Sequence, residues 1–231
     1  MAGDVHARVA ADWVDRNLGV RLADTARLAE ALTHRSLPGP NYERLEFLGD
    51  AVLAFVVAEL LFERHPAASE GDLSRLRASL VSGEVLGSVA LALGLGDVVR
   101  LGEGELKSGG FRRQSILADA LEALLGAVYL ELGMAAARQV IDRLLGERIE
   151  ALPPAAALKD PKTRLQEYLQ ARGLALPLYR VDEIMGEPHA RSFRVSCELP
   201  ELGLSSDAAG SSRKRAEQQA AETLLRELGS A

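Results

Sequence analysis

Apolar positions in residues 1–150 recur every three or four residues, which is the spacing of amphipathic helices. The helices that this spacing predicts are Val5–Asn17, Leu22–Thr33, Glu43–Arg64, Glu70–Leu93 as one or two helices, Arg113–Leu132 and Met134–Glu150. The helix over Glu43–Arg64 has a mostly apolar middle, Ala51–Ala58. Residues 1–150 are therefore predicted to form an all-helical domain.

The pattern changes at Ala151–Leu158, where two consecutive prolines end the preceding helix and small residues follow. Beyond it, apolar and polar residues alternate as they do in half-buried strands. The predicted elements are a helix over Thr163–Arg172, strands over Leu178–Met185, Ser192–Glu198 and Leu202–Asp207, and a helix from Ser211 or Ser212 to Leu228. We interpret residues 151–159 as a linker and residues 160–229 as a small α+β domain of order α-β-β-β-α.

Length and composition narrow the class of protein. The chain has 231 residues, of which 48% are hydrophobic, so one large or two small packed domains are expected. The longest uncharged stretch, Val85–Gly96, is shorter than the roughly 20 apolar residues of a membrane span. Cys197 is the only cysteine, which excludes internal disulfides and cysteine-based zinc sites. We expect a cytoplasmic protein with no membrane partner.

The net charge of −6 is unevenly distributed along the chain. Residues 1–158 hold 16 basic and 22 acidic residues, whereas residues 159–231 hold 11 of each. An acidic total by itself argues against a nucleic-acid partner. Because the whole excess belongs to the helical part, the neutral second domain remains able to present a local basic surface.

Acidic residues with helical spacing lie beside apolar positions on two predicted helices. Glu43, Glu46 and Asp50 fall within about 60° of one another on the first, and Asp119 and Glu122 are three residues apart on the second. Carboxylates against an apolar core need compensating cations. Oxygen ligands favour Mg²⁺ or Mn²⁺, so the pattern predicts a site for a hard divalent metal ion.

Two other interpretations of these acids remain open from spacing alone. They can form a solvated face or pair with neighbours such as Arg44 or Arg75. A di-iron bundle is a second possibility, but it usually contains Glu-x-x-His. The chain has four histidines, and none of them follows a glutamate by three residues: His6, His34, His65 and His189.

The segment Glu43-Arg-Leu-Glu-Phe-Leu-Gly-Asp50 resembles the signature sequence of the ribonuclease III family. Four further segments resemble that family in the same order: Thr33-His-Arg-Ser36, Glu70-Gly-Asp-Leu-Ser74, Gly104-Glu-Leu-Lys-Ser-Gly-Gly-Phe-Arg-Arg113 and Ile116-Leu-Ala-Asp-Ala-Leu-Glu-Ala-Leu-Leu-Gly126. The likeness covers nearly the whole chain and is greatest to the short bacterial form. It implies a ribonuclease III catalytic domain over residues 1–150.

The resemblance implies roles for the acidic residues. Glu46, Asp50, Asp119 and Glu122 match the divalent-metal ligands of the family, Asp50 and Glu122 among them as catalytic residues. Glu43 and Glu70 match accessory acidic positions near the cleavage site and the dimer interface. The implied cofactor is Mg²⁺, with Mn²⁺ as a substitute, because two such ions activate water and stabilise the leaving oxygen.

Three other residues near the signature bear on structure. Phe47 matches a position that the family packs across its homodimer interface, although an ordinary core phenylalanine is an equal alternative. His34 is expected to be structural, since the family mechanism uses no imidazole. Tyr42 stands where the family often has asparagine, and Asn41 one residue earlier is a candidate cap for the helix.

The second domain resembles a double-stranded-RNA-binding domain in Lys162-Thr-Arg-Leu-Gln-Glu-Tyr-Leu-Gln170 and Gly210-Ser-Ser-Arg-Lys-Arg-Ala-Glu-Gln-Gln-Ala-Ala221. In that family the first helix and the first strand turn enter successive minor grooves, and the last helix meets the phosphates between them. The match assigns Gln166, Glu167 and His189 to the grooves. Arg213, Lys214 and Arg215 are the phosphate candidates, with Lys107, Arg112 and Arg113 expected near the cut and solvated loop positions as the alternative.

The resemblance implies an endoribonuclease that hydrolyses double-stranded RNA to 5′-phosphate and 3′-hydroxyl ends with short 3′ overhangs. Ribosomal-RNA precursors and some mRNAs are the implied substrates. One rival is a non-catalytic double-stranded-RNA-binding protein, which the presence of all four matched ligands disfavours. A metal-dependent phosphatase or oxidoreductase on a helical bundle is another, which the RNA-binding segment disfavours.

Overall fold

A computed structural model describes residues 2–152, 159–186 and 191–229. The chain divides into two compact units, Met1–Ala155 and Ala156–Ala231. The division falls inside the predicted linker. Residues 153–158 of that linker and the predicted groove residue His189 lie outside the described residues, so the exact limits of the linker stay a prediction.

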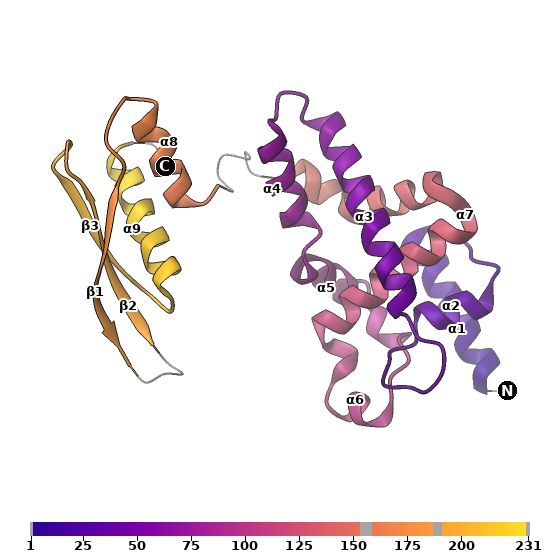
Figure 1. The fold of residues 1–231 in the computed structure, drawn as a ribbon. Helices are drawn as coiled ribbons and strands as arrows, with labels where there is room; N and C mark the ends of the chain where they lie inside the picture. Colours follow the sequence, from indigo (N-terminus) through magenta and orange to yellow (C-terminus); the bar gives the residue numbers. More distant parts are fainter. Residues whose placement is uncertain (1, 153–158, 187–190, 230–231) are drawn as a thin grey trace. The chain divides into compact units, whose positions relative to one another are not determined.

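The first unit is helical, as the apolar spacing predicts (Figure 1). Its elements are α1 (Ala2–Leu18), α2 (Thr25–Ala31), α3 (Glu43–Arg64), α4 (Glu70–Leu80), α5 (Gly83–Ala92), a 3-10 turn (Leu95–Asp97), α6 (Glu103–Lys107), a second 3-10 turn (Gly110–Arg112) and α7 (Gln114–Glu150). The segment predicted as Glu70–Leu93 forms two helices because the Ser82 hydroxyl accepts a hydrogen bond from the Val85 N–H and starts α5. The segment 104–113, predicted as a loop, contains most of α6 and a 3-10 turn.

The start of α3 is set by Asn41, as its sequence position predicts. Its side-chain oxygen accepts a hydrogen bond from the N–H of Glu43 at 3.0 Å, although the residue at the helix boundary is Tyr42. This bond satisfies a backbone donor that has no partner within the helix. It also fixes where Glu46 and Asp50 fall around α3.

The helix α7 contains a break at Gly133, whose φ of 79° and ψ of 178° are not helical. The two helices predicted over Arg113–Leu132 and Met134–Glu150 therefore meet at this glycine. By length and composition alone α7 is apolar enough to cross a membrane, but half of its most apolar window is buried in the unit. It packs against α3 and α5, which is typical of the central helix of a helical domain.

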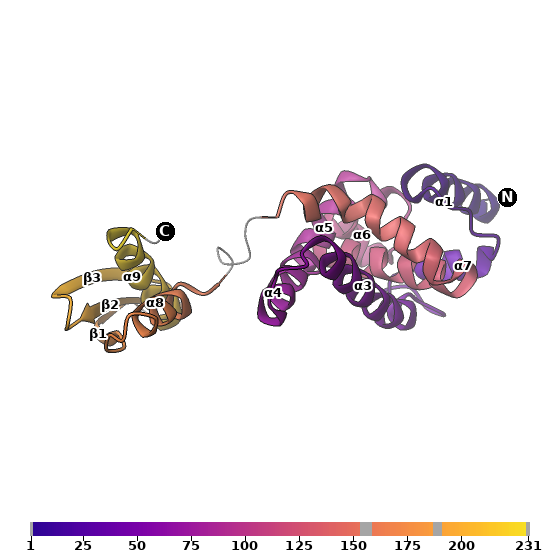
Figure 2. The same cartoon turned by 90° about the horizontal axis from the view of Figure 1, so that it is seen from above.

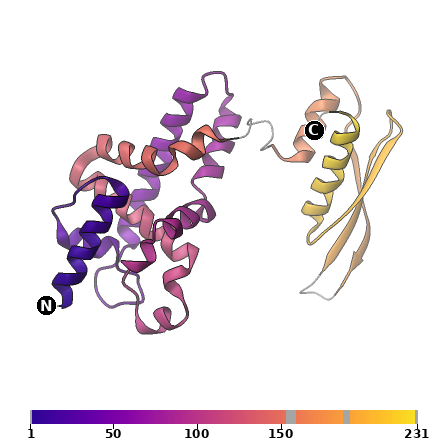
Figure 3. The ribbon, with the colours of Figure 1, turned by 180° about the vertical axis from the view of Figure 1, so that it is seen from behind.

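Helices α3 and α7 cross at very short range, and Figures 2 and 3 show this crossing from two sides. A Cβ atom on Gly49 would lie 1.7 Å from the carbonyl oxygen of Glu122, and one on Gly126 would lie 2.4 Å from that of Leu45. Only glycine permits the two backbones to approach so closely. This contact brings the acidic face of α3 against that of α7.

The second unit is the predicted α-β-β-β-α domain: α8 (Pro161–Gln170), β1 (Leu178–Met185), β2 (Ser192–Leu199), β3 (Leu204–Gly210) and α9 (Arg213–Glu227). The strands form an antiparallel sheet in the order β1-β2-β3, and both helices cover the same face of it (Figures 1 and 2). A bond from the Ser206 hydroxyl to the Ala220 carbonyl, 2.8 Å long, ties β3 to α9. The core consists of Leu165, Leu169, Cys197, Leu199, Ala220, Ala221, Leu224 and Leu225.

Candidate metal centre and nucleic-acid surface

Three carboxylates from the two crossing helices meet in one group. Glu46 comes from α3, and Asp119 and Glu122 come from α7. One carboxylate oxygen of each lies within 4.8 Å of the others, and all three side chains are half-buried. Four metal ligands were predicted from the sequence, and the structure brings three of them together: Glu46, Asp119 and Glu122.

Burial and mutual repulsion make this group electrostatically unfavourable. Burial, followed by the charges of Asp50, Asp119 and Glu46, raises the pKa of Glu122 to about 8. Burial is also the largest cause of the raised pKa of Glu46 and of Asp119. A cation among these oxygens would relieve the repulsion.

The carboxylate group has the composition of a site for a hard divalent ion. Within the described residues, Glu46, Asp119 and Glu122 form no ion pair with lysine or arginine, so the alternative that they pair with neighbours such as Arg44 or Arg75 is wrong for them. Arg75, one suggested partner, instead pairs with Asp72 at 2.6 Å. No described histidine contributes to the group, which removes the di-iron alternative. All donors are oxygens, and oxygen ligands suit Mg²⁺ and Mn²⁺.

Asp50, the fourth predicted ligand, lies at the edge of this group. Its side chain is exposed, and its oxygens are not among those within 4.8 Å. Its charge nevertheless contributes to the raised pKa of Glu122. One turn of α3 separates it from Glu46, so the spacing alone did not distinguish a central ligand from a peripheral one.

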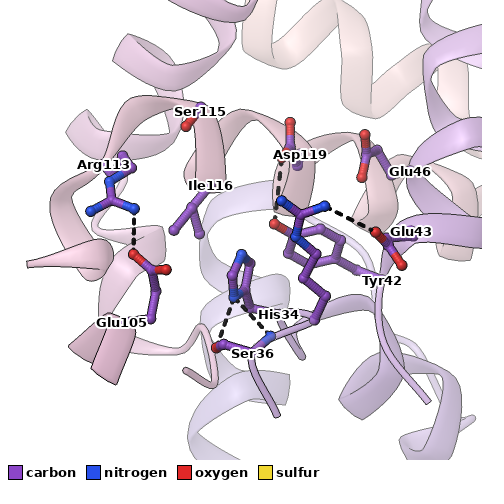
Figure 4. A pocket seen from close by; sticks show the side chains of 11 residues that line it. His34, Ser36, Tyr42, Glu43, Glu46, Glu105, Arg113, Ser115, Ile116 and Asp119 are labelled. Atoms are coloured by element: carbon purple, nitrogen blue, oxygen red, sulfur yellow. Dashed lines mark hydrogen bonds and ion pairs between the residues drawn. The ribbon is translucent and has the colours of Figure 1, made fainter. Parts of the chain in front are cut away.

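Two of the three carboxylates, Glu46 and Asp119, line an open cavity of about 670 Å³ (Figure 4). Glu43, Glu46, Tyr42 and Asp119 line one part of it, and Glu105 and Arg113 line another. The cavity is large enough to receive part of a polymeric substrate beside the carboxylates. The predicted accessory residue Glu43 is therefore at the site.

Tyr42 and His34 line the cavity beside Asp119. The buried Tyr42 hydroxyl donates to Asp119 Oδ2 at 3.4 Å, and its ring meets the His34 ring edge-on at 5.6 Å. His34 Nδ1 accepts the Ser36 N–H at 3.1 Å, and burial lowers the pKa of the imidazole. A neutral, buried histidine in this position agrees with the structural role expected for His34.

Other residues predicted near the cut are distributed differently. Glu70 begins α4, which follows the far end of α3, and its carboxylate accepts a bond from the Ser74 hydroxyl at 2.8 Å. Among the basic residues of segment 104–113, only Arg113 lines the cavity, where it pairs with Glu105. Lys107 pairs with Glu103 at 3.5 Å, and the guanidinium of Arg112 lies 5.1 Å above the ring of Phe111.

Phe47 is 81% exposed, so its interpretation as a core residue is wrong. Phe55 and Phe62 on the same helix are 56% and 71% exposed. The three rings fall within about 80° around α3. We call these three residues the phenylalanine stripe. Such an apolar face on a monomer marks an interaction surface.

In the second unit, the predicted groove residues Gln166 and Glu167 are exposed on α8. Lys159 holds the Glu167 carboxylate at 2.8 Å, which fixes the orientation of that side chain. Gln166 and Glu167 share the solvent face of α8 with Thr163 and Gln170, since these positions are separated by three or four residues. The face is polar, as contact with ribose hydroxyls requires.

The phosphate candidates Arg213, Lys214 and Arg215 form the exposed first turn of α9. Ser212 caps this helix by accepting the N–H of Arg215 at 3.2 Å. The helix N-terminus and the three cations together favour phosphate. This surface is locally basic although the unit has no net charge.

Sequence reasoning missed Glu217 on α9. Its carboxylate is buried, pairs with Arg213 at 2.8 Å and also accepts Lys162 of α8, and these partners lower its pKa against the effect of burial. It thus links α8 and α9. The signal was present, because Glu217 is four residues after Arg213.

The fold and the site define a class: a helical domain with a carboxylate group that could hold a metal ion, followed by an α-β-β-β-α domain with a polar helix face and a basic helix terminus. Comparison with known families agrees. Residues 24–149 match the Ribonuclease-III-like family, and residues 161–228 match the double-stranded RNA binding motif.

Individual relatives extend this agreement over nearly the whole chain. The proteins named Ribonuclease 3 from Pseudomonas fluorescens (strain SBW25) and Aromatoleum aromaticum (strain DSM 19018 / LMG 30748 / EbN1) are 57% and 56% identical to it. Each alignment covers 94% of this chain, and 94% and 96% of the respective relative. A solved nuclease domain of ribonuclease III from Campylobacter jejuni is 43% identical, with a TM-score of 0.57, over 59% of this chain and 96% of that one.

The chain belongs to the ribonuclease III family. It is an endoribonuclease of double-stranded RNA and, like the family, depends on a metal ion.

Proposed function

We propose that the chain hydrolyses double-stranded RNA with Mg²⁺, for which Mn²⁺ substitutes, and that Glu46, Asp119 and Glu122 hold the metal with help from Asp50. The observation that carries this proposal is the group of three carboxylates within 4.8 Å beside an open cavity. When bound, divalent ions activate a water molecule and stabilise the leaving oxygen.

The residues of the chain then have distinct tasks. Glu46, Asp119 and Glu122 supply negative charge that offsets the ions, and the exposed position of Asp50 leaves it free to turn toward them. Tyr42 orients Asp119 through its hydroxyl. Glu122 must lose its proton before it acts as a ligand, because its pKa of about 8 keeps it mostly protonated at pH 7 without metal.

We further propose that two copies of the chain associate through the phenylalanine stripe. A twofold axis would set the two α3 helices side by side and antiparallel. Because α3 is about 33 Å long, this arrangement would bring Glu70 at the far end of one copy toward the cavity of the other. Two cavities facing opposite strands would give short 3′ overhangs, with 5′-phosphate and 3′-hydroxyl ends.

The RNA is proposed to be held by the second unit. Gln166 and Glu167 would enter one minor groove, and Arg213, Lys214 and Arg215 would contact the phosphates that follow. This mode of binding recognises the shape of the A-form helix more than its sequence. Stems in ribosomal-RNA precursors and in some mRNAs are the proposed substrates.

A labelled RNA duplex and its separate strands, incubated with Mg²⁺ or with EDTA, test this function. We expect cutting of the duplex only, and only with Mg²⁺. Glu122→Gln should abolish cutting and leave duplex binding unchanged, whereas Glu147→Gln, an exposed position in α7 after its break at Gly133, should change neither. A duplex that stays intact with Mg²⁺, or binding that falls with cutting in Glu122→Gln, would contradict the proposal.

A further inference from the structure

Arg35 lies in the segment between α2 and α3 and lines the cavity together with Glu43, Glu46 and Asp119. Its guanidinium is 3.6 Å from Glu43 Oε1, and its side chain is 71% exposed. No role was assigned to it from the sequence. It therefore places a positive charge beside a group of carboxylates that would otherwise repel an approaching phosphate.

The backbone that carries Arg35 is held firmly on both sides. The His34 N–H donates to the Arg100 carbonyl at 3.0 Å, and the Tyr42 N–H donates to the Thr33 carbonyl at 2.9 Å. The Ser36 hydroxyl accepts the Gly102 N–H at 2.8 Å. The side chain of Arg35 thus extends from a fixed point and is itself free to change partner.

Two cations among the described residues line this cavity, and they differ in how firmly they are bound. Arg113 pairs with Glu105 and also donates to the Ser108 hydroxyl at 3.3 Å. The pair between Arg35 and Glu43 is longer and exposed, and exposed ion pairs of this kind contribute little to stability. Arg35 is the cation that a new anion can recruit at little cost.

We propose that Arg35 binds a phosphate group of the RNA strand that lies against the carboxylate group, exchanging Glu43 for phosphate oxygens. The inference rests on the proposed function of that group. A guanidinium matches phosphate with two parallel hydrogen bonds, and these charge-assisted bonds are stronger than a loose surface ion pair. Before RNA arrives, the same charge compensates part of the acidic surface.

The exchange predicts a loss of catalysis in Arg35→Gln. We expect kcat/KM for a duplex to fall about 10- to 100-fold, the loss of a hydrogen bond to a charged group. The slope of log kcat/KM against log salt should become shallower by about 0.9, because one phosphate contact is gone. Arg35→Lys keeps the positive charge but cannot form the two parallel hydrogen bonds of a guanidinium, so it should recover part of the activity.

Metal binding without RNA should change in the opposite direction. Removing a positive charge next to Glu43, Glu46 and Asp119 lowers the repulsion of a divalent ion. We expect Arg35→Gln to bind Mn²⁺ about threefold more tightly, measured from the free Mn²⁺ signal in electron paramagnetic resonance. Weaker cutting combined with tighter metal binding is a result that simple structural damage would not produce.

Arg16→Gln is the matched control, since Arg16 is an exposed arginine on α1 that does not line the cavity. It should leave kcat/KM, the salt slope and Mn²⁺ affinity near those of the unmodified chain. Equal losses in Arg35→Gln and Arg16→Gln, or an unchanged salt slope in Arg35→Gln, would overturn the assignment. If Arg35→Gln does not fold, Arg35→Lys is decisive: unchanged kcat/KM and salt slope would overturn the role.

Cutting by the unmodified chain distinguishes failure of the proposed function from failure of the Arg35 assignment. If it does not cut the duplex with Mg²⁺, the proposed function of the carboxylate group fails. If it cuts and Arg35→Gln cuts equally well, only the role of Arg35 fails.

Discussion

The carboxylate group should make the chain less stable without metal, and Glu122→Gln tests this directly. Burial and three neighbouring carboxylates raise the pKa of Glu122 from 4.5 to about 8. The native state therefore holds this proton more tightly than the unfolded state between these two pH values. The free energy of unfolding therefore falls as pH rises from 4.5 to 8, and the full loss is reached above pH 8.

The expected gain in stability of Glu122→Gln follows from the raised pKa of Glu122. A difference of 3.5 corresponds to an upper limit of about 5 kcal/mol. Glu122 keeps substantial contact with solvent, so screening reduces this value, and we expect a gain of roughly 1–2 kcal/mol for Glu122→Gln at pH 9. Below pH 4.5 the carboxyl is protonated in both states, and the gain should disappear.

Trp13 provides the assay. It is the only tryptophan of the chain, is buried in the helical unit and donates its indole N–H to the Leu93 carbonyl at 2.9 Å. Its fluorescence therefore follows unfolding of the unit that holds the carboxylates, separately from the second unit. Urea titrations in EDTA at pH 4.5, 7 and 9, at one protein concentration, give the free energy of unfolding.

Bound metal should make the unmodified chain more stable than Glu122→Gln, which reverses the difference in the free energy of unfolding expected in EDTA. Saturation at 100 times the dissociation constant stabilises the unmodified chain by about 2.7 kcal/mol, and the variant with one ligand fewer gains less. Glu147→Gln on the same helix controls for removal of a charge. A variant that is less stable than the unmodified chain in EDTA at pH 9, or a difference independent of pH, would refute this reasoning.

Three further outcomes are expected. Gly49→Ala should destabilise the helical unit by about 3 kcal/mol and lower cutting, because the added Cβ meets the Glu122 carbonyl. The control Gly83→Ala, which has open space around the added Cβ, should not destabilise the unit. Urea unfolding followed by Trp13 fluorescence measures both variants. Phe47→Asp should convert dimers to monomers in light scattering with unchanged helix content, and a persistent dimer would contradict the stripe as interface. In Arg213→Gln, the slope of log binding constant for a duplex against log salt should become shallower by about 0.9. An unchanged slope would exclude a phosphate contact by Arg213.

The sequence was sufficient for what depends on neighbours along the chain. Apolar spacing predicted α3 and the strands β1 and β2 nearly to the residue, because helix and strand periods are local properties. The spacing of Asp119 and Glu122 likewise fixed that they share one face of α7. The signature around Glu46 was specific enough to indicate the family.

Distances between helices were decided by tertiary structure. The close crossing at Gly49 determines that Glu46 reaches Asp119 and Glu122 and that Asp50 remains at the edge. Helical spacing places Glu46 and Asp50 on the same face, so it gave no means to separate them. Phe47 shows the same limit, because an apolar residue in an apolar helix is assigned to the core unless its neighbours are known.

Ion-pair partners also required the three-dimensional structure. Arg35 meets Glu43 from a separate segment, and Lys162 and Arg213 converge on Glu217 from two helices. Sequence by itself determined the elements, the two-domain order and the chemical types of the functional groups. Packing decided which of those groups meet, since the energy of a charge depends on burial and on neighbours a few ångströms away.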